Sequence, residues 1–311
     1  MNNQKNSYLV LALILIFSLV LASCAPAQTP VATENPQTTQ KLVIGLSLST
    51  LDNPFFVSVQ EGAQEAADRL GATLIVTDAK NDTATQSAQV QDLIKQKVSL
   101  LLVNPVDSDT VGAVIQTANS AGVPVITLDR SANSGKVVSH IASDNVAGGK
   151  MAGSYLAELL GKTGNVVELE GIAGTSAAKD RGAGFNESIS AYSNIKVIAH
   201  EVADFDRTKA KEVFSQLLTQ YPEINGVFAH NDSMILGAMD AAQEAGRQDI
   251  VFVGFDAIDE AVQAVESGSL SATVAQQPKE IGRLGVETAI NFLNGETVTE
   301  FIPVDLALVH K

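Results

Sequence analysis

Short runs of Val, Ile and Leu recur from residue 42 onward, separated by longer stretches with apolar residues at helical spacing. We predict ten strands from these runs, at 42–48, 73–78, 98–103, 123–128, 137–142, 165–170, 195–202, 225–230, 250–255 and 270–275. The stretches 55–70 and 278–293 predict helices that end near Gly71 and Gly295, because glycine suits the residue that terminates a helix. Alternating strands and helices predict an α/β fold with parallel sheets. Ten strands are many for one sheet, so we expect two similar lobes of about five.

Polar and aromatic side chains follow most of these strands. In an open parallel sheet, ligands bind beyond the carboxyl ends of the strands. If the two lobes face each other, the side chains at their strand ends converge on one ligand. The candidates from the two halves are Ser49, Asp52, Asn53, Phe55, Phe56, Asn104, Asp129, Arg130, Arg181, Phe205, Asn231, Asp256 and Gln276.

The chemistry of this set suits a polyol. Carboxylate, amide and guanidinium groups are planar and carry several fixed donors or acceptors, so they can bind adjacent hydroxyl groups and a ring oxygen. Phenylalanine rings offer flat apolar faces to the C–H faces of a sugar ring. The combination therefore indicates a monosaccharide site, although no single residue does.

Simpler structural roles remain open for the residues near the first strand and for Phe205. Asn53 followed by Pro54 is a good start for a helix on local grounds alone. Phe55 and Phe56 point about 100° apart on a helix, so we expect one in the core and one facing the cleft. Phe205 lies between two aspartates in a loop, which is hard to explain as core packing.

The charged candidates also have structural alternatives. Adjacent Asp129 and Arg130 on a loop can form an exposed ion pair that contributes little. A single polar residue at a strand end is commonplace, so structural roles stay open for Arg181, Asn231 and Asp256.

An enzyme would need a nucleophile, a base or a metal site, and the strand ends show none. The histidines at 140, 200, 230 and 310 are dispersed, without a second ligand at helix or strand spacing, so we expect no metal. His230 is expected to be a packed residue at a strand end. Asp129 and Asp256 could imitate the acid pair of a glycosidase, but Arg130 favours an ionised Asp129, which accepts hydrogen bonds and cannot act as an acid. We therefore expect a non-enzymatic binding protein.

The first forty residues differ from the rest. Lys5 precedes an apolar run at 8–22, and Leu21-Ala22-Ser23-Cys24 follows. The run is short for a membrane span, which is the alternative. This pattern resembles the signal peptide of bacterial lipoproteins, which implies that 1–23 is removed and that Cys24 carries the lipid. Residues 25–40 contain Pro and Thr without aromatic residues and predict an extended tether.

Composition narrows the function classes. The 311 residues allow two domains, and 45% hydrophobic residues exclude a disordered chain. A net charge of −15 disfavours nucleic acid, anionic lipid surfaces and polyanionic ligands. The single cysteine, Cys24, excludes an intramolecular disulfide.

Eight segments of the chain form a distinctive set: STLDNPFF (49–56), NPVDSDTVG (104–112), PVITLDR (124–130), SHIASDNVAGGKMAG (139–153), GIAGTSAAKDRGAGF (171–185), ADFDR (203–207), HNDSMILGA (230–238) and VGFDA (253–257). These segments resemble those of the pentose/hexose periplasmic binding proteins, which are related to LacI-type repressors, and within that family its ribose-binding branch. The likeness runs from about Lys41 to the end.

The resemblance implies two Rossmann-like lobes that close on one sugar. Three crossings would fall near Ser143-Asp144, Gln276-Gln277 and Asp305, which gives one lobe of 41–143 plus 277–305 and another of 144–276 plus 306–311. The implied ribose ligands are Ser49, Asn53, Phe55, Phe56, Asp129, Arg130, Arg181, Phe205, Asn231, Asp256 and Gln276. The chain departs from the family at His230, where glutamine is familiar, and in its lipoprotein start.

The same resemblance implies the partners. We expect D-ribose or a similar monosaccharide, the transmembrane subunits of an ABC permease, and a chemoreceptor as a further partner. It implies a monomer with no cofactor and no metal, exported and held by lipid at the outer face of the cell membrane or in the periplasm. Two rivals remain. A sugar-responsive regulator would need a helix-turn-helix where the export signal lies, and a glycosidase or isomerase would be revealed by product analysis after incubation with sugar.

Overall fold

The computed structural model describes residues 41–311. The predicted signal peptide (1–23), Cys24 and the tether lie outside the described residues. Lys41–Lys311 forms one unit. In this part of the chain, no helix is both long and apolar enough to cross a membrane.

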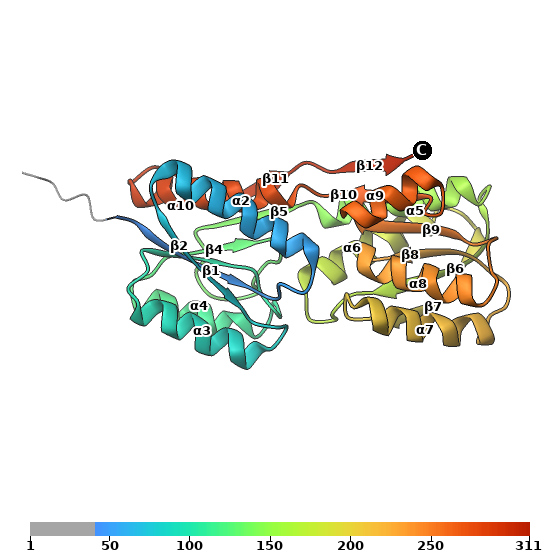
Figure 1. Cartoon of the computed structure of the whole chain (residues 1–311), viewed down its shortest axis with the longest axis horizontal. Helices are drawn as coiled ribbons and strands as arrows, with labels where there is room; N and C mark the ends of the chain where they lie inside the picture. The colour runs from blue at the N-terminus through green and yellow to red at the C-terminus, as the bar shows by residue number, and fades with distance from the viewer. Residues whose placement is uncertain (1–40) are drawn as a thin grey trace, which may run out of the picture. The chain divides into compact units, whose positions relative to one another are not determined.

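The first sheet has six parallel strands in the order β11-β5-β4-β3-β1-β2. Helices α2 and α10 cover one face and α3 and α4 the other (Figure 1). Its strands are β1 (Val43–Leu48), β2 (Thr73–Asp78), β3 (Leu100–Val103), β4 (Val125–Leu128), β5 (Ser139–Ser143) and β11 (Phe301–Val304). Its helices are α2 (Pro54–Leu70), α3 (Thr83–Lys95), α4 (Val111–Ser120) and α10 (Pro278–Leu293).

The second sheet also has six strands, in the order β12-β10-β9-β8-β6-β7, and only β12 is antiparallel to its neighbour. Helices α5 and α6 pack on one face, and α7, α8 and α9 pack on the other. Its strands are β6 (Thr163–Glu170), β7 (Asn194–Val202), β8 (Ile224–Ala229), β9 (Val251–Asp256), β10 (Ala272–Ala275) and β12 (Ala307–His310). Its helices are α5 (Asn145–Leu159), α6 (Ser176–Ile189), α7 (Arg207–Gln220), α8 (Asp232–Glu244) and α9 (Asp259–Ser267).

We call the first sheet with its helices the N-lobe and the second the C-lobe. The α/β fold with two parallel-sheet lobes is confirmed, as are the ten predicted strands. The expected five strands per lobe was one too few, because β11 and β12 were missed. Each has only four residues, is mostly exposed or half-buried, and lies in a stretch interrupted by Pro303 and Asp305.

Glycines lie at the ends of the two predicted helices as expected, although one of them lies one residue beyond the helix cap. Gly71 has φ 74° and directly caps α2. Gly295 has φ 86° but lies one residue beyond the cap of α10, which is Asn294. Both glycines adopt the left-handed backbone that side chains disfavour.

The chain changes sheet at three places. It leaves β5 for α5 after Ser143, leaves β10 for α10 after Ala275, and runs from β11 to β12 between Val304 and Ala307. These connections put the carboxyl ends of strands from both sheets around one space.

Reciprocal glycines bring two helix pairs close. A Cβ on Gly62 of α2 would lie 2.0 Å from the Lys279 carbonyl oxygen of α10, and a Cβ on Gly282 would lie 2.0 Å from that of Val59. In the C-lobe, Gly149 of α5 and Gly184 of α6 make the equivalent approach, with backbone oxygens at 2.1 and 2.0 Å. Each helix that follows a crossing is therefore packed tightly into its own lobe.

Candidate functional site

A small cavity lies between the strand ends of the two lobes. It is lined by Asn53, Phe55, Phe56, Asp129, Arg130, Ala177, Arg181, Phe205, Asn231, Asp256 and Gln276. Ten of the eleven implied ribose ligands therefore meet here. Ser49 does not line the cavity, and Ala177 was not foreseen.

The start of α2 presents one edge of the cavity. The Oδ1 atom of Asn53 accepts a hydrogen bond from the Phe55 N–H at 2.9 Å, and Pro54 occupies the first turn. Asn53 is therefore the helix cap that the simpler interpretation required, and it also lines the cavity.

The expectation that Phe55 and Phe56 would divide between core and cleft was wrong. Both are buried, both belong to the N-lobe core and both line the cavity. Their rings meet edge to face, with centroids 5.2 Å apart and an interplanar angle of 89°. Phe55 and Phe56 can each pack in the N-lobe core and also line the cavity, because the cavity adjoins the end of this core.

Asp129 and Arg130 follow β4 and are not a surface ion pair, since each is only 3% exposed. Arg130 Nε lies 3.8 Å from Asp129 Oδ2, and its Nη1 donates to the Pro105 carbonyl at 3.1 Å. The guanidinium lies between two rings, 5.2 Å from the centroids of both Phe56 and Phe205. A cation between aromatic faces is stabilised in this position.

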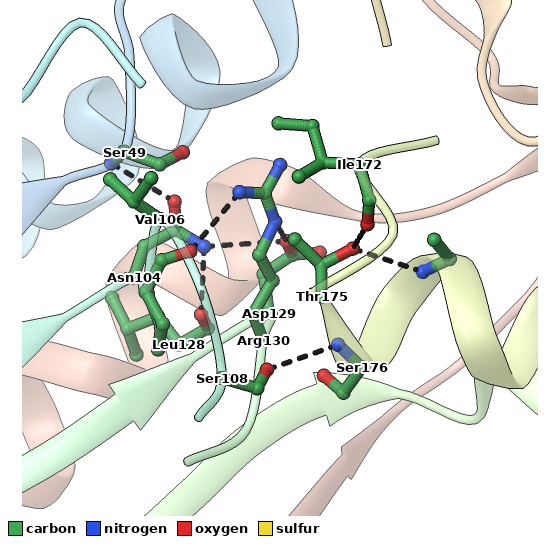
Figure 2. A network of polar contacts seen from close by, with 12 residues as sticks. Ser49, Asn104, Val106, Ser108, Leu128, Asp129, Arg130, Ile172, Thr175 and Ser176 are labelled. Atoms are coloured by element: carbon green, nitrogen blue, oxygen red, sulfur yellow. Dashed lines mark hydrogen bonds and ion pairs between the residues drawn. The ribbon is translucent and has the colours of Figure 1, made fainter. Parts of the chain in front are cut away.

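Asn104 supports this corner from behind (Figure 2). Its Oδ1 accepts from the Ser49 N–H at 3.2 Å. Its Nδ2 donates to the Leu128 carbonyl at 3.1 Å and to Asp129 Oδ2 at 3.4 Å. Ser49 thus lies one layer behind the cavity wall and positions the group that holds Asp129.

Hydrogen bonds join the lobes beside the cavity. The Ser176 N–H donates to Ser108 Oγ at 3.0 Å, as Figure 2 shows, and the Ser131 N–H donates to Ser176 Oγ at 2.9 Å. The Ser108 N–H donates to the Gly174 carbonyl at 3.1 Å. These bonds cross from N-lobe loops to the start of α6, so the structure is a closed arrangement.

Arg181 of α6 is held by groups of the C-lobe. Its Nε donates to Asn145 Oδ1 at 2.8 Å and its Nη1 to the His230 carbonyl at 2.6 Å. The Nη1 atom also lies 3.5 Å from Asp256 Oδ1, and the guanidinium stacks 3.9 Å from the centre of the Phe255 ring. These contacts fix the guanidinium against the cavity wall.

The remaining polar groups of the C-lobe lie beside Arg181. Gln276 Nε2 donates to Asp256 Oδ1 at 2.8 Å. Asn231 caps α8 by accepting from the Met234 N–H at 3.0 Å and donates to the Phe205 carbonyl at 3.4 Å. Like Asn53, Asn231 is both a helix cap and a cavity residue.

Phe205 reaches the cavity from a loop with φ 59°. Gly171 makes room for it, since a Cβ there would lie 2.0 Å from Phe205 Cζ. The ring packs partly on the C-lobe core, so it is not purely a ligand-facing residue.

Burial shapes the electrostatics of the cavity. It raises the pKa of Asp256 to about 7, although the charge of Arg181 opposes the shift. It also raises the pKa of Asp129 and lowers that of Arg130 to about 10. For these three groups, the loss of hydration on burial shifts the pKa more than the neighbouring opposite charges shift it back.

Four buried atoms at or behind this wall have no hydrogen-bond partner among the described residues: Ser49 Oγ, Asp129 Oδ1, Arg130 Nε and Gln276 Oε1. Buried polar atoms are nearly always partnered in folded proteins. Donors and acceptors left free around a space lined by aromatic rings suit a small polar molecule with an apolar face.

The family model described as "Periplasmic binding protein domain" matches residues 44–297. The chain belongs to the periplasmic binding protein family. It is 50% identical to the ribose import binding protein RbsB of Escherichia coli (strain K12) over 291 residues, which is 94% of this chain and 98% of that protein. The protein of the same name from Bacillus subtilis (strain 168) is 44% identical over 305 residues, or 98% and 99% of the two chains.

Solved structures agree with this assignment of the fold. An ABC transporter solute binding protein from Mycobacterium smegmatis with bound glycerol has a TM-score of 0.84 and 37% identity, covering 87% of this chain and 94% of that one. One from Actinobacillus succinogenes 130z with bound D-allose has a TM-score of 0.82 and 33% identity, covering 87% and 98%. The predicted family and its two-lobed fold are therefore confirmed.

For this periplasmic binding protein, two features of the cavity were not predicted from the sequence. Ala177 lies in the first turn of α6 and contributes only a methyl group, which no chemical pattern marks. Gly171 was visible only as part of a glycine-containing loop, and its role depends on Phe205 from another strand end. His230 is buried directly after β8, as expected of a packed residue.

Proposed function

We propose that this protein captures D-ribose between its lobes and delivers it to the membrane subunits of an ABC permease, without catalysing a reaction. The observation that carries the proposal is the cavity between the lobes, which ten of the implied ribose ligands line and where Asp129, Arg130 and Gln276 each keep a buried polar atom unpartnered among the described residues. The names of the relatives, ribose import binding proteins, support the same ligand class. Another pentose or a hexose is the second candidate, because a similar structure holds D-allose.

The proposed binding mode assigns roles by chemistry. Asp129 and Asp256 accept from adjacent sugar hydroxyls, and Arg130 and Arg181 donate to hydroxyl and ring oxygens. Asn53, Asn231 and Gln276 complete the polar edge, with Ser49 behind Asp129. Phe55, Phe56 and Phe205 contact the C–H faces of the ring. Ribose has about ten heavy atoms, and under the ceiling of ~1.5 kcal/mol per atom a Kd between about 1 μM and 50 nM is expected.

Closure couples binding to transport in this proposal. The cavity residues come from both lobes, so a sugar in an open cleft gains its second set of contacts only when the lobes meet. Its stronger binding to the closed form shifts the equilibrium. Small-angle scattering should show a smaller radius of gyration with saturating ribose. Identical profiles, with binding verified by calorimetry, would contradict closure.

The decisive test of ligand class is titration calorimetry with a panel of pentoses and hexoses. D-Ribose should bind and D-glucose should not, because its extra hydroxymethyl group has no room between the three phenylalanines and no polar partner. Glucose binding as tight as ribose would overturn the ribose assignment. Binding of another sugar alone would keep the site and change its ligand.

Cys24 is proposed as the membrane anchor. It follows the apolar run as the only cysteine, and two or three acyl chains would hold the protein without a span. Cys24→Ala should leave an uncleaved or released protein that partitions into the aqueous phase on detergent extraction. Clean signal removal with unchanged membrane partitioning would refute the anchor while leaving the sugar site untouched.

A further inference from the structure

A second group of ligand-type side chains lies outside the sugar cavity, on the β6–β7 side of the C-lobe. Glu168 and Glu170 belong to β6 and His200 to β7, and Glu168 pairs directly with His200 in the parallel register. Alternate residues of a strand share a face, so all three side chains point to the same side of the sheet. One ligand atom from each lies within 4.8 Å of the others.

The charges of this group are unbalanced. His200 Nδ1 lies 2.7 Å from Glu168 Oε2 and 3.7 Å from Glu170 Oε1. Across residues 41–311, neither carboxylate forms an ion pair with a lysine or arginine; the only basic side chains within ion-pair distance of either are His200 and His230. Two carboxylates that share imidazole partners attract a further positive charge.

Glu168 is fully buried and held in a fixed orientation. His230 Nε2 contacts its Oε1 at 2.8 Å, and Asn186 Nδ2 donates to its Oε2 at 2.8 Å. The Gly171 N–H donates to His230 Nδ1 at 3.2 Å, which makes Nε2 the protonated nitrogen that faces Glu168. Outer partners of this kind orient carboxylates that bind metals.

The other two groups can be reached from solvent. The His200 side chain is 44% exposed and that of Glu170 is 35% exposed, and β7 is the edge strand of its sheet. An ion entering here would meet one buried, oriented carboxylate and two side chains free to adjust.

We propose that Glu168, Glu170 and His200 bind a divalent transition-metal ion such as Zn²⁺. Zinc lies about 2.0–2.2 Å from nitrogen and oxygen ligands, so tetrahedral ligand atoms are ~3.4 Å apart. The distance from His200 Nδ1 to Glu168 Oε2 must therefore increase from 2.7 Å, and the distance from His200 Nδ1 to Glu170 Oε1 must decrease from 3.7 Å. Rotation of the His200 and Glu170 side chains, which are partly exposed, allows both changes. To bind the ion through Nδ1, His200 would carry its remaining proton on Nε2. An imidazole with two carboxylates suits zinc better than magnesium, which prefers oxygen ligands and water.

Calorimetric titration with ZnCl2 tests the site on its own, without sugar. All proteins should be untagged and carry Cys24→Ser, so that the single thiol cannot bind zinc. The reference should bind one Zn²⁺ per chain and not respond to MgCl2. His200→Gln and Glu170→Gln should each weaken binding at least about tenfold. His310→Gln, an exposed histidine elsewhere, should leave it unchanged.

Co²⁺ absorption gives a second measurement that does not depend on stability. The reference should develop visible bands of a four- or five-coordinate ion, and His200→Gln should abolish them. Absence of saturable Zn²⁺ binding in the reference would overturn the proposal. Equal binding by the reference and His200→Gln would overturn it as well, because the ion would then lie elsewhere.

Discussion

Each lobe contributes one aspartate and one arginine to the cavity, but the two pairs are built differently. In the N-lobe, Asp129 and Arg130 are neighbours in sequence, and Arg130 has one neutral partner, the Pro105 carbonyl, while its Nε lacks a hydrogen bond. In the C-lobe, Asp256 and Arg181 come from β9 and α6, and Arg181 is held by two further groups of its own lobe. The C-lobe half is therefore preorganised, whereas the N-lobe half keeps bonding capacity for a ligand.

Replacing each of the two arginines by alanine should give the largest effects and should test whether the two lobes differ as described. Arg181→Ala should weaken ribose binding by about 2–4 kcal/mol, because sugar oxygens and Asp256 lose their donor. It should also lower the Tm of the sugar-free protein, since the His230 carbonyl and Asn145 lose theirs. Arg130→Ala should weaken binding similarly with a smaller loss of Tm, because Arg130 gives up one hydrogen bond to the Pro105 carbonyl and its pairing with Asp129, whereas Arg181 gives up two hydrogen bonds and its pairing with Asp256. Calorimetry and thermal unfolding measure both.

Arg181→Lys and Arg130→Lys serve as controls, because each keeps the charge and loses the planar fork. Equal Tm losses for the two alanine variants would contradict the difference between the lobes. Unchanged ribose affinity in Arg181→Ala would remove that residue from the site.

The substitution Gly171→Ala should have the next largest effect on ribose binding. The added Cβ would lie 2.0 Å from Phe205 Cζ, so the ring must move into the cavity or out of it. Overpacking of this kind costs ~1–3 kcal/mol, and we expect most of it as lost ribose affinity measured by calorimetry. The matched control is Gly246→Ala on the surface, where no atom lies within 4 Å but the positive φ still costs stability. Full ribose affinity in Gly171→Ala would show that Phe205 is not held as described.

The pH dependence of the free energy of unfolding should reveal the raised pKa of the buried Asp256 carboxyl group. Burial raises its pKa to about 7 in the folded protein, so the folded state binds the proton more tightly than the unfolded state. Its contribution to stability is therefore fullest below the unfolded pKa and is lost as the pH rises through about 7. Between pH 5 and 7, the wild type should lose about 2 kcal/mol relative to Asp256→Asn, at ~1.4 kcal/mol per pKa unit.

Urea unfolding of the two proteins at several pH values measures this difference. The pKa of Asp232, another buried aspartate, is raised by burial and by the charge of Asp256, so the comparison should be repeated in an Asp232→Asn background. Parallel stability curves would mean that Asp256 ionises normally.

The smallest effects should come from the two capping asparagines. Asn53→Asp and Asn231→Asp keep a good helix cap and remove the amide donor, whereas the alanine variants lose both. We expect the alanine variants to lose about 1 kcal/mol of stability and the aspartate variants to keep it. All four should bind ribose more weakly. Full ribose affinity in Asn53→Asp would reduce Asn53 to a cap alone.

The parts of the fold that could be predicted are those whose signal is local. Buried parallel strands such as β3 are uninterrupted apolar runs, and polar groups at their ends follow directly in sequence. β11 and β12 could not be predicted because their pairing with β5 and β10, and not their composition, makes them strands.

Candidate residues were missed or misjudged for a related reason. Ala177 has no distinctive chemistry, and the placement of Ser49 behind Asp129 depends on Asn104. The four histidines looked dispersed because spacing along one element was considered. His200 and His230 meet on Glu168 only through the alignment of three strands.

The way the chain returns to its first lobe sets the order in which the lobes can be completed during synthesis. Helix α10, which packs against α2, and strand β11, which pairs with β5, both follow the whole of β6 to β10 in sequence. The C-lobe lacks only its four-residue edge strand β12 when residue 275 has been made. The half of the molecule that leaves the ribosome first must therefore wait for the other half before it can close its core, and its folding depends on contacts between distant parts of the chain, which form slowly.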